Sequence, residues 1–173
     1  MTRSIAVDGR TLSLEAIEAV ARDPSVRVTL DDTARERVKA SRDFIEAKVA
    51  TGEPVYGVTT GFGRLADISI PADQRATLQH NLVRSHASGM GDPMSQPSVR
   101  ALMVLRANAL ARGFSGCRTD VIEQLLALLN AGIHPRVPEF GSVGASGDLA
   151  PLAHVALGLL GEGEVEYKGE KKQ

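Results

Sequence analysis

The residues best suited to chemistry lie in the stretch GSVGASGDLAPL, residues 141–152, where three glycines and two serines precede an apolar segment. Ser146 could cap the helix predicted after it, a common use of serine. The triplet Ala145, Ser146 and Gly147 could instead react with itself. In a tightly bent backbone, the glycine nitrogen can attack the alanine carbonyl and the serine hydroxyl can leave as water. Loss of two waters then gives a five-membered ring with an exocyclic methylene.

Such a ring would be a strong carbon electrophile made without an added cofactor, whereas ordinary side chains supply nucleophiles, acids and bases. Gly141 and Gly144 would permit the tight bend. A helix beginning near Asp148 would direct its positive end at the ring oxygen and stabilise negative charge there. From the triplet alone, the helix-cap interpretation is the commoner one, so the chemical interpretation needs support from other segments.

The elements that must position this stretch are predicted to be mainly helical. Apolar periodicity with terminal Ser, Pro or Gly residues predicts helices over residues 14–23, 31–52, 71–89, 96–113, 121–132 and 151–163. Asp120 and Glu123 form a capping-box-like pair before the fifth of these helices. Three glycines and two consecutive threonines predict a loop over residues 53–65.

Short β-structure is expected near both ends of the chain. Asp8 followed by Gly9, within an alternating pattern, indicates a hairpin, and residues 26–30 predict a brief strand. Residues 164–167 predict another strand, with Lys168 and Gly169 as a hairpin turn. Because the sequence stops where the partner strand should lie, two interpretations stay open: a truncated domain or a frayed tail.

Composition argues against several classes of protein. The 20 Lys and Arg residues balance 21 Asp and Glu residues without forming a basic stripe, so we expect no nucleic-acid partner. Apolar runs fall short of the ~20 residues that span a bilayer, so we expect no membrane association. Cys117 has no second cysteine to pair with, and we expect an inert thiol in a cytoplasmic protein. The spacing of potential ligands indicates no metal site.

Residues 141–156, GSVGASGDLAPLAHVA, resemble the signature of the aromatic amino acid ammonia-lyases, a family with a self-formed methylidene-imidazolone ring. Residues 56–63, YGVTTGFG, resemble the family's loop with its catalytic tyrosine. Residues 78–93, LQHNLVRSHASGMGDP, resemble its substrate-pocket helix, particularly in histidine ammonia-lyases, and residues 99–118 are also similar to the family. The resemblance implies a mainly α fold, the N-terminal portion of the helical ammonia-lyase fold, with residues 1–173 forming one truncated, ring-bearing domain.

The resemblance also assigns catalytic roles. Ala145, Ser146 and Gly147 are implied to be the ring-forming triplet, so no cofactor has to be added. Tyr56 is implied to be the base or proton relay, although a loop aromatic could instead fill the core. Gly63 belongs to the glycines that would let this loop close over a substrate.

Substrate choice depends on three positions. Ser85 and His86 match the histidine-lyase pattern, in which the histidine contacts substrate, although a lone helical histidine is more often a surface residue. Phenylalanine lyases typically carry apolar residues there. Thr59 departs from the histidine-lyase pattern, because many of those enzymes carry asparagine at this position and threonine is frequent in tyrosine and phenylalanine lyases and in tyrosine aminomutases. The remaining histidines lack such a match: His80, His134 and His154.

The resemblance therefore implies an ammonia-lyase that converts L-histidine to urocanate, in a homotetramer with active sites shared between subunits. The alternative is a tyrosine or phenylalanine ammonia-lyase or aminomutase that uses the same ring. A different class is a non-catalytic interaction module in which Ser146 stays unprocessed. Because family members are about three times longer, we expect the chain alone to be inactive.

Overall fold

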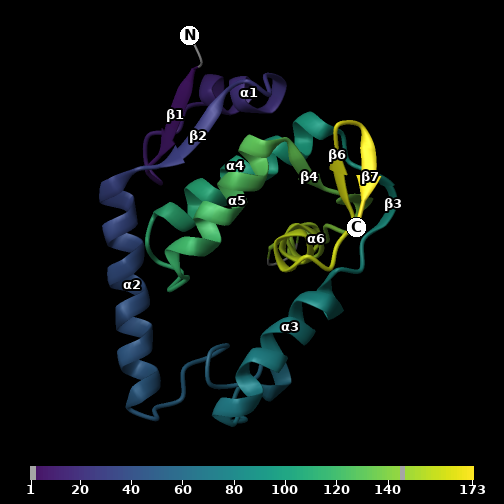
Figure 1. Cartoon of the computed structure of the whole chain (residues 1–173). Helices are drawn as coiled ribbons and strands as arrows, with labels where there is room; N and C mark the ends of the chain where they lie inside the picture. Colours follow the sequence, from purple (N-terminus) through teal and green to yellow (C-terminus); the bar gives the residue numbers. More distant parts are fainter. Residues whose placement is uncertain (1–2, 145–146) are drawn as a thin grey trace.

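The computed structural model describes residues 3–144 and 147–173, so Ala145 and Ser146, on which the ring prediction falls, lie outside the described residues. Those residues form six α-helices and seven short strands, which confirms the mainly helical prediction. Helices α4 (Gln96–Ala111) and α5 (Thr119–Ala131) lie side by side in the middle of the molecule (Figure 1).

Helix α4 is the centre of the core. Ser95 accepts a hydrogen bond from Ser98 N at its N-terminus, and Pro97 lies in its first turn, as predicted. Seven of its residues are buried: Val99, Arg100, Met103, Val104, Ala107, Leu110 and Ala111. Helix α5 packs against it and ends at Gly132, whose φ of 72° is the left-handed conformation that favours glycine. This pair is the support on which the other elements are arranged.

The N-terminal segment is a parallel unit, so the hairpin prediction at Asp8 and Gly9 was wrong. Strand β1 (Ser4–Val7) pairs in parallel with β2 (Arg27–Leu30), and helix α1 (Leu14–Arg22) connects them. Asp8 Oδ1 accepts hydrogen bonds from Arg10 N and Thr11 N, while Gly9 N donates to Asn108 Oδ1 at 2.9 Å. These bonds turn the chain towards α1 instead of back along β1. Ser13 caps α1, as predicted.

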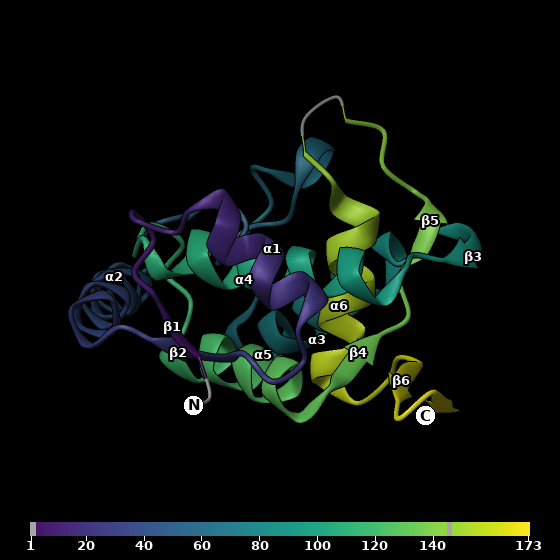
Figure 2. The ribbon, with the colours of Figure 1, turned by 90° about the horizontal axis from the view of Figure 1, so that it is seen from above.

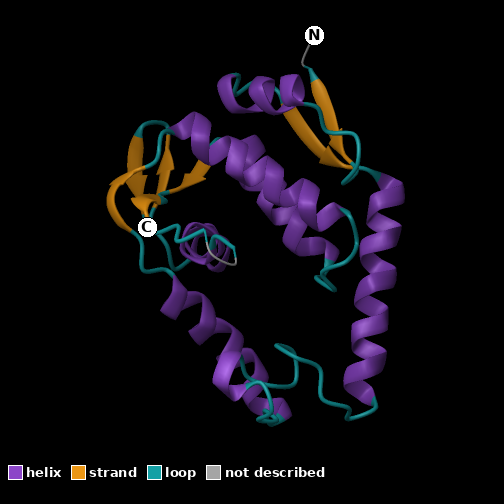
Figure 3. Ribbon diagram, turned by 180° about the vertical axis from the view of Figure 1, so that it is seen from behind, coloured by secondary structure: helices purple, strands orange, loops and turns teal. Residues whose placement is uncertain are grey.

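A long helix and a loop lead to the segment that resembles the substrate pocket. Helix α2 (Asp32–Ala50) precedes the predicted loop, which contains a 3₁₀ turn, Gly63–Leu65. A second 3₁₀ turn, Ala72–Gln74, precedes α3 (Arg75–His86). Figure 3 shows α2 and α3 extending away from the central pair and joined by this loop.

Helix α6 (Leu149–Leu160) follows residues 141–148 and packs beside α3 (Figure 2). Strand β3 (Met90–Pro93), which follows α3, pairs antiparallel with β5 (Pro138–Phe140), which precedes the triplet. The end of α3 and the start of α6 are therefore joined through this strand pair.

The C-terminal strands form a closed hairpin, so the expectation that the partner strand is missing was wrong. Strand β6 (Val165–Tyr167) pairs with both β4 (Ile133–Pro135) and β7 (Glu170–Lys172). Lys168 and Gly169 have φ values of 53° and 76°, as a two-residue turn with both central residues at positive φ requires. The predicted turn is confirmed, and the last residues of the chain are sufficient for the partner strand.

The capping-box prediction at Asp120 and Glu123 was wrong. Arg118 occupies the N-cap position of α5 and makes no side-chain cap hydrogen bond. Asp120 accepts from Arg118 Nε, and Glu123 pairs with Arg35 of α2. Their charges therefore serve contacts with other side chains. Across the described ranges, no helix combines the length and apolar character needed to cross a bilayer.

Candidate active site

The backbone bends at the two glycines that flank Ala145 and Ser146. Gly144 and Gly147 have φ values of 67° and 117°, which strain residues with a side chain. Asp148 is the N-cap residue of α6 but caps it with no side-chain hydrogen bond, because its carboxylate accepts from Ser142 Oγ. The first N–H groups of α6 are therefore not capped by this side chain, and they form the positive end of the helix at the triplet.

A cavity of about 320 Å³ lies at this end of α6. Its lining comes from the end of α3, from the residues that follow β5, and from the first residues of α6. These residues are Ser85, His86, Ser88, Gly141, Val143, Gly147, Leu149 and Ala150. The structure thus brings three predicted site residues, Ser85, His86 and Gly147, to one cavity.

The orientation of His86 is set by the last turn of α3. Its Nδ1 lies 2.8 Å from Leu82 O, and a carbonyl oxygen can accept but not donate. In the neutral ring the proton is therefore on Nδ1, and Nε2 is the nitrogen that can accept a hydrogen bond. Ser85 Oγ donates to the same carbonyl at 2.9 Å and lies 3.1 Å from His86 Nδ1. Ser85 supports the histidine at the edge of the cavity.

Tyr56 and Gly63 form a second group of predicted residues. Gly63 N lies 3.4 Å from Tyr56 Oη, and the Tyr56 ring meets Phe62 edge-on with centroids 5.8 Å apart. Tyr56 is 63% exposed, so it does not fill the core. Neither Tyr56 nor Gly63 is among the residues that line the cavity beside His86. Within the described chain, the predicted site is therefore divided into two parts.

Two buried threonines hold the loop that carries Tyr56. Thr59 is 4% exposed, and its Oγ1 accepts from Val55 N at 2.7 Å. Thr60 is 3% exposed, and its Oγ1 accepts from Gly57 N at 3.2 Å. Because both hydroxyls bond to backbone on either side of Tyr56, they fix its position. The Thr59 hydroxyl is therefore engaged inside the loop, which weakens it as a guide to substrate choice.

Sequence reasoning gave no role to His154, which lies on α6 and accepts a hydrogen bond from Gly89 N at 3.1 Å. A single histidine in an apolar helix carries no local signal for such a contact, since its partner is 65 residues away. Cys117 is half-buried, and burial raises the pKa of its thiol, in keeping with an unreactive group. No cluster of three or more His, Cys, Asp or Glu side chains suited to a metal ion occurs in residues 3–144 and 147–173.

The mainly helical fold agrees with comparisons to known proteins. The family described as aromatic amino acid lyase matches residues 12–173. The chain belongs to this family, as the motifs in residues 56–63, 78–93 and 141–156 predicted.

Individual members of the family are similar to nearly the whole chain. A histidine ammonia-lyase of Streptococcus pyogenes serotype M5 (strain Manfredo) is 53% identical over 170 residues, covering 98% of this chain and 33% of the relative. The solved ergothionase of Treponema denticola has a TM-score of 0.93 at 36% identity, covering 98% of this chain and 34% of its own. The tyrosine aminomutase of Streptomyces globisporus has a TM-score of 0.90 at 39% identity, covering 98% and 31%. The chain thus spans about a third of the length of these relatives.

Proposed function

We propose that this chain is the N-terminal, ring-bearing part, residues 1–173, of an ammonia-lyase that converts L-histidine to urocanate and ammonia. The observation that carries the proposal is the cavity shared by His86 and Gly147. The similarity of nearly the whole chain to histidine ammonia-lyase adds support. A cytoplasmic location stays a prediction.

The described residues beside the triplet fit a ring formed from Ala145, Ser146 and Gly147. A Cβ added at Gly147 would meet no atom of residues 3–144 and 147–173 within 4 Å, so the described surroundings of this residue are open. Helix α6 begins with Leu149, directly after Asp148, so its N–H groups can stabilise negative charge on a ring oxygen. When formed, the ring supplies a carbon electrophile without any added cofactor.

The chain's own side chains would bind the substrate and move one proton. His86 Nε2 would accept a hydrogen bond from the substrate imidazole, since Nδ1 is already engaged by Leu82 O. Tyr56 Oη would act as the base that takes a proton from the substrate β-carbon. The electron pair of that C–H bond becomes the second bond between the α- and β-carbons. The C–N bond breaks, and its electron pair leaves with the nitrogen as ammonia.

The separation of Tyr56 from the cavity supports an active site shared between subunits. Tyr56 is exposed and held by its own loop, whereas His86 lies at the other end of α3. In the full-length homotetramer that we propose, Tyr56 of one subunit would approach the cavity of another. The 173-residue chain by itself would then be inactive.

The second candidate is a tyrosine or phenylalanine ammonia-lyase or aminomutase that uses the same ring. The similarity to a solved tyrosine aminomutase at 39% identity favours it. Thr59 gives it less support than the sequence suggested, because the Thr59 hydroxyl bonds to Val55 N within the loop. The two candidates differ in substrate and product, which a direct assay separates.

The test uses the full-length gene product, incubated separately with L-histidine, L-tyrosine and L-phenylalanine. We expect urocanate and ammonia from histidine, and faster turnover of histidine than of the other two. A tryptic peptide of residues 137–168 should be lighter by two waters than its sequence implies. Active enzyme with an unmodified peptide would exclude the ring, and a preference for tyrosine would favour the second candidate. An unmodified peptide from an inactive protein would indicate an interaction module.

A further inference from the structure

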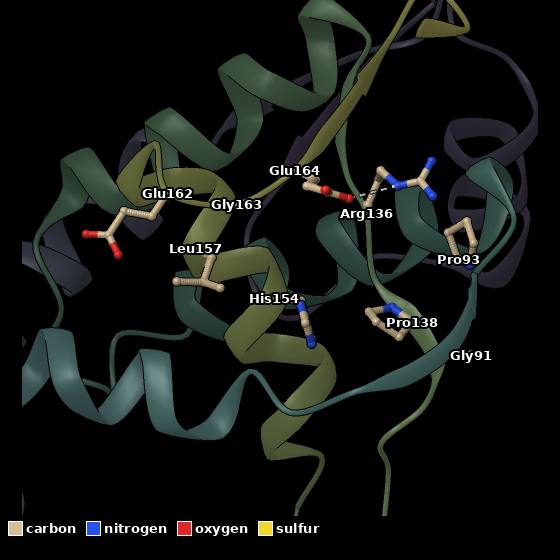
Figure 4. A pocket seen from close by; sticks show the side chains of 9 residues that line it. All are labelled: Gly91, Pro93, Arg136, Pro138, His154, Leu157, Glu162, Gly163 and Glu164. Carbon is tan, nitrogen blue, oxygen red and sulfur yellow. Dashed lines mark ion pairs between the residues drawn. The ribbon is translucent and has the colours of Figure 1, made fainter. Parts of the chain in front are cut away.

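His154 links the helix that follows the triplet to the segment that follows His86. It lies on α6, six residues after the N-cap Asp148, which corresponds to a rise of roughly 9 Å. Its Nε2 accepts a hydrogen bond from Gly89 N at 3.1 Å, and Gly89 is the third residue after His86. Figure 4 shows the ring projecting from α6 towards the segment between α3 and β3.

The protonation of His154 suits this contact. Gly89 N–H can only donate, so His154 Nε2 must be an unprotonated acceptor and the ring proton must be on Nδ1. Burial lowers the pKa of His154, which favours the neutral ring at neutral pH. The hydrogen bond is therefore present under the conditions in which an ammonia-lyase would work.

Three chain segments pack closely around Gly89. A Cβ added at Gly89 would lie 3.0 Å from His154 Nε2 and 3.1 Å from Pro138 Cβ. A Cβ added at Gly141 would lie 3.2 Å from Gly89 Cα. Gly89 after α3, Gly141 before the triplet and one face of α6 are thus in direct contact. A shift of Gly89 would move both walls of the cavity that contains His86.

A second connection between α3 and α6 lies nearer the surface. Arg84 makes two hydrogen bonds of 2.7 Å to Glu162, which follows α6. The Arg84 side chain is about half exposed, and ion pairs at such positions contribute little in water. The bond from Gly89 to His154 is partly buried, so it is the better candidate for fixing the distance between the two helices.

We propose that His154 is a positioning residue: by holding Gly89, it fixes His86 relative to the triplet at the start of α6. This inference rests on the proposed function. His154 does not itself line the cavity that contains His86 and Gly147. His154 acts on His86 through the backbone of residues 87–89. The position of that backbone determines how closely His86 can approach a substrate attached at the ring.

The test compares His154→Leu and His154→Gln in the full-length protein. Leucine fills similar space but cannot accept a hydrogen bond, whereas the glutamine amide oxygen can. We expect His154→Leu to keep the two-water loss in peptide 137–168 and to raise KM for histidine by about tenfold, the upper range for one lost hydrogen bond. We expect kcat to change less than KM, and His154→Gln to recover most of the wild-type KM.

A third variant tests the contact from its other side. Gly89→Ala places a methyl group against His154 Nε2, so it should raise KM in the same direction. In the double variant with His154→Leu, the rise in KM should be smaller than the product of the rises in the two single variants, because both substitutions disturb the same contact. Independent effects would contradict a shared contact and overturn the inference.

Other outcomes separate this inference from the proposed function. A ring-bearing His154→Leu protein with wild-type KM would overturn the role of His154 and leave the proposed function intact. Equal losses in the leucine and glutamine variants would show that His154 serves packing alone, which also overturns the inference. Wild-type protein without a ring or turnover would overturn the proposed function, and the role of His154 with it. If the wild type prefers tyrosine, the same KM comparison applies to tyrosine.

Discussion

Arg100 and His134 pack against each other in the core, with Arg100 Nη1 3.2 Å from His134 Nε2. Arg100 is 1% exposed and also donates to three carbonyl oxygens, those of Val20, Asp23 and Leu129. A guanidinium can only donate, so His134 Nε2 accepts and the ring is neutral. This single arginine connects the ends of α1 and α5 to strand β4.

The first prediction concerns stability at acid pH. Burial, assisted by the charge of Arg100, lowers the pKa of His134 to about 4, from an ordinary value of 6.5. As the pH falls, the unfolded chain therefore binds this proton at a higher pH than the folded chain does. The contribution of the neutral His134 ring to stability is fully present above pH 6.5 and is lost as the pH falls towards 4. The loss should be on the order of 3 kcal/mol in the free energy of unfolding. Urea unfolding of the chain at several pH values measures it.

A control variant isolates this residue from the carboxylates. His134→Gln keeps an acceptor for Arg100 but does not titrate, so its stability should depend less on pH in this window. A wild-type chain whose stability is unchanged between pH 6.5 and pH 4 would contradict the assignment of His134 as a buried neutral ring.

The second prediction concerns Tyr56. In the full-length protein, Tyr56→Phe keeps the ring that packs against Phe62 but removes the hydroxyl near Gly63 N. Loss of an acid–base group should lower kcat for histidine by roughly 10²-fold or more, with a modest change in KM. Steady-state kinetics measure both constants. Undiminished kcat would assign proton transfer to another residue.

The third prediction concerns His86. His86→Leu removes the acceptor Nε2 from the cavity and leaves Leu82 O to Ser85. For histidine, the fall in kcat/KM should correspond to a loss of about 1–3 kcal/mol of transition-state stabilisation, the scale for a buried partner left unpaired. Activity on tyrosine or phenylalanine should rise relative to histidine, because an apolar wall suits their rings. Histidine turnover equal to that of the wild type would make His86 a structural residue.

The fourth prediction separates loop structure from substrate choice. Thr59→Val removes the buried acceptor of Val55 N, whereas Thr59→Ser keeps it. The valine variant should lower kcat, because the loop that carries Tyr56 is less well fixed, and the serine variant should stay near wild type. Neither variant should change the ratio of histidine to tyrosine activity by more than about threefold, a change no larger than the net contribution of one hydrogen bond. A reversed ratio would show that residue 59 does select the substrate.

The fifth prediction concerns the 173-residue chain alone. Large apolar side chains are exposed near the cavity, where Met90, Phe140, Val143 and Leu149 are 73%, 66%, 88% and 58% accessible. Exposed apolar patches of this kind drive association. Light scattering at rising concentration should show oligomers, and a monodisperse monomer throughout would be inconsistent with the expectation.

Local signals allowed the helices to be predicted from the sequence. Ser13, Asp31 and Ser95 accept hydrogen bonds from the first turns of their helices, and Gly132 and Gly161 end helices at positive φ. Each of these contacts joins residues close in sequence, so residue type is a sufficient guide.

Contacts between distant residues could not be predicted in this way. Strand β1 pairs with β2, and the chain does not form a hairpin at Gly9, because Gly9 N donates a hydrogen bond to Asn108 Oδ1. The contact between His154 and Gly89 joins residues that no local pattern relates. For the candidate site, the resemblance predicted roles for Tyr56 and His86, but it did not predict that this chain places them in separate groups.

The bond between Gly9 and Asn108 spans 99 residues, and that between Arg100 and Val20 spans 80. During synthesis, strands β1 and β2 and helix α1 therefore leave the ribosome long before α4, the helix that covers them. Until about a hundred residues have emerged, Val7, Val20 and Val28 have no core to enter. The nascent N-terminal unit should therefore be recognised by chaperones that bind exposed apolar segments, and it should become protected once α4 has been made.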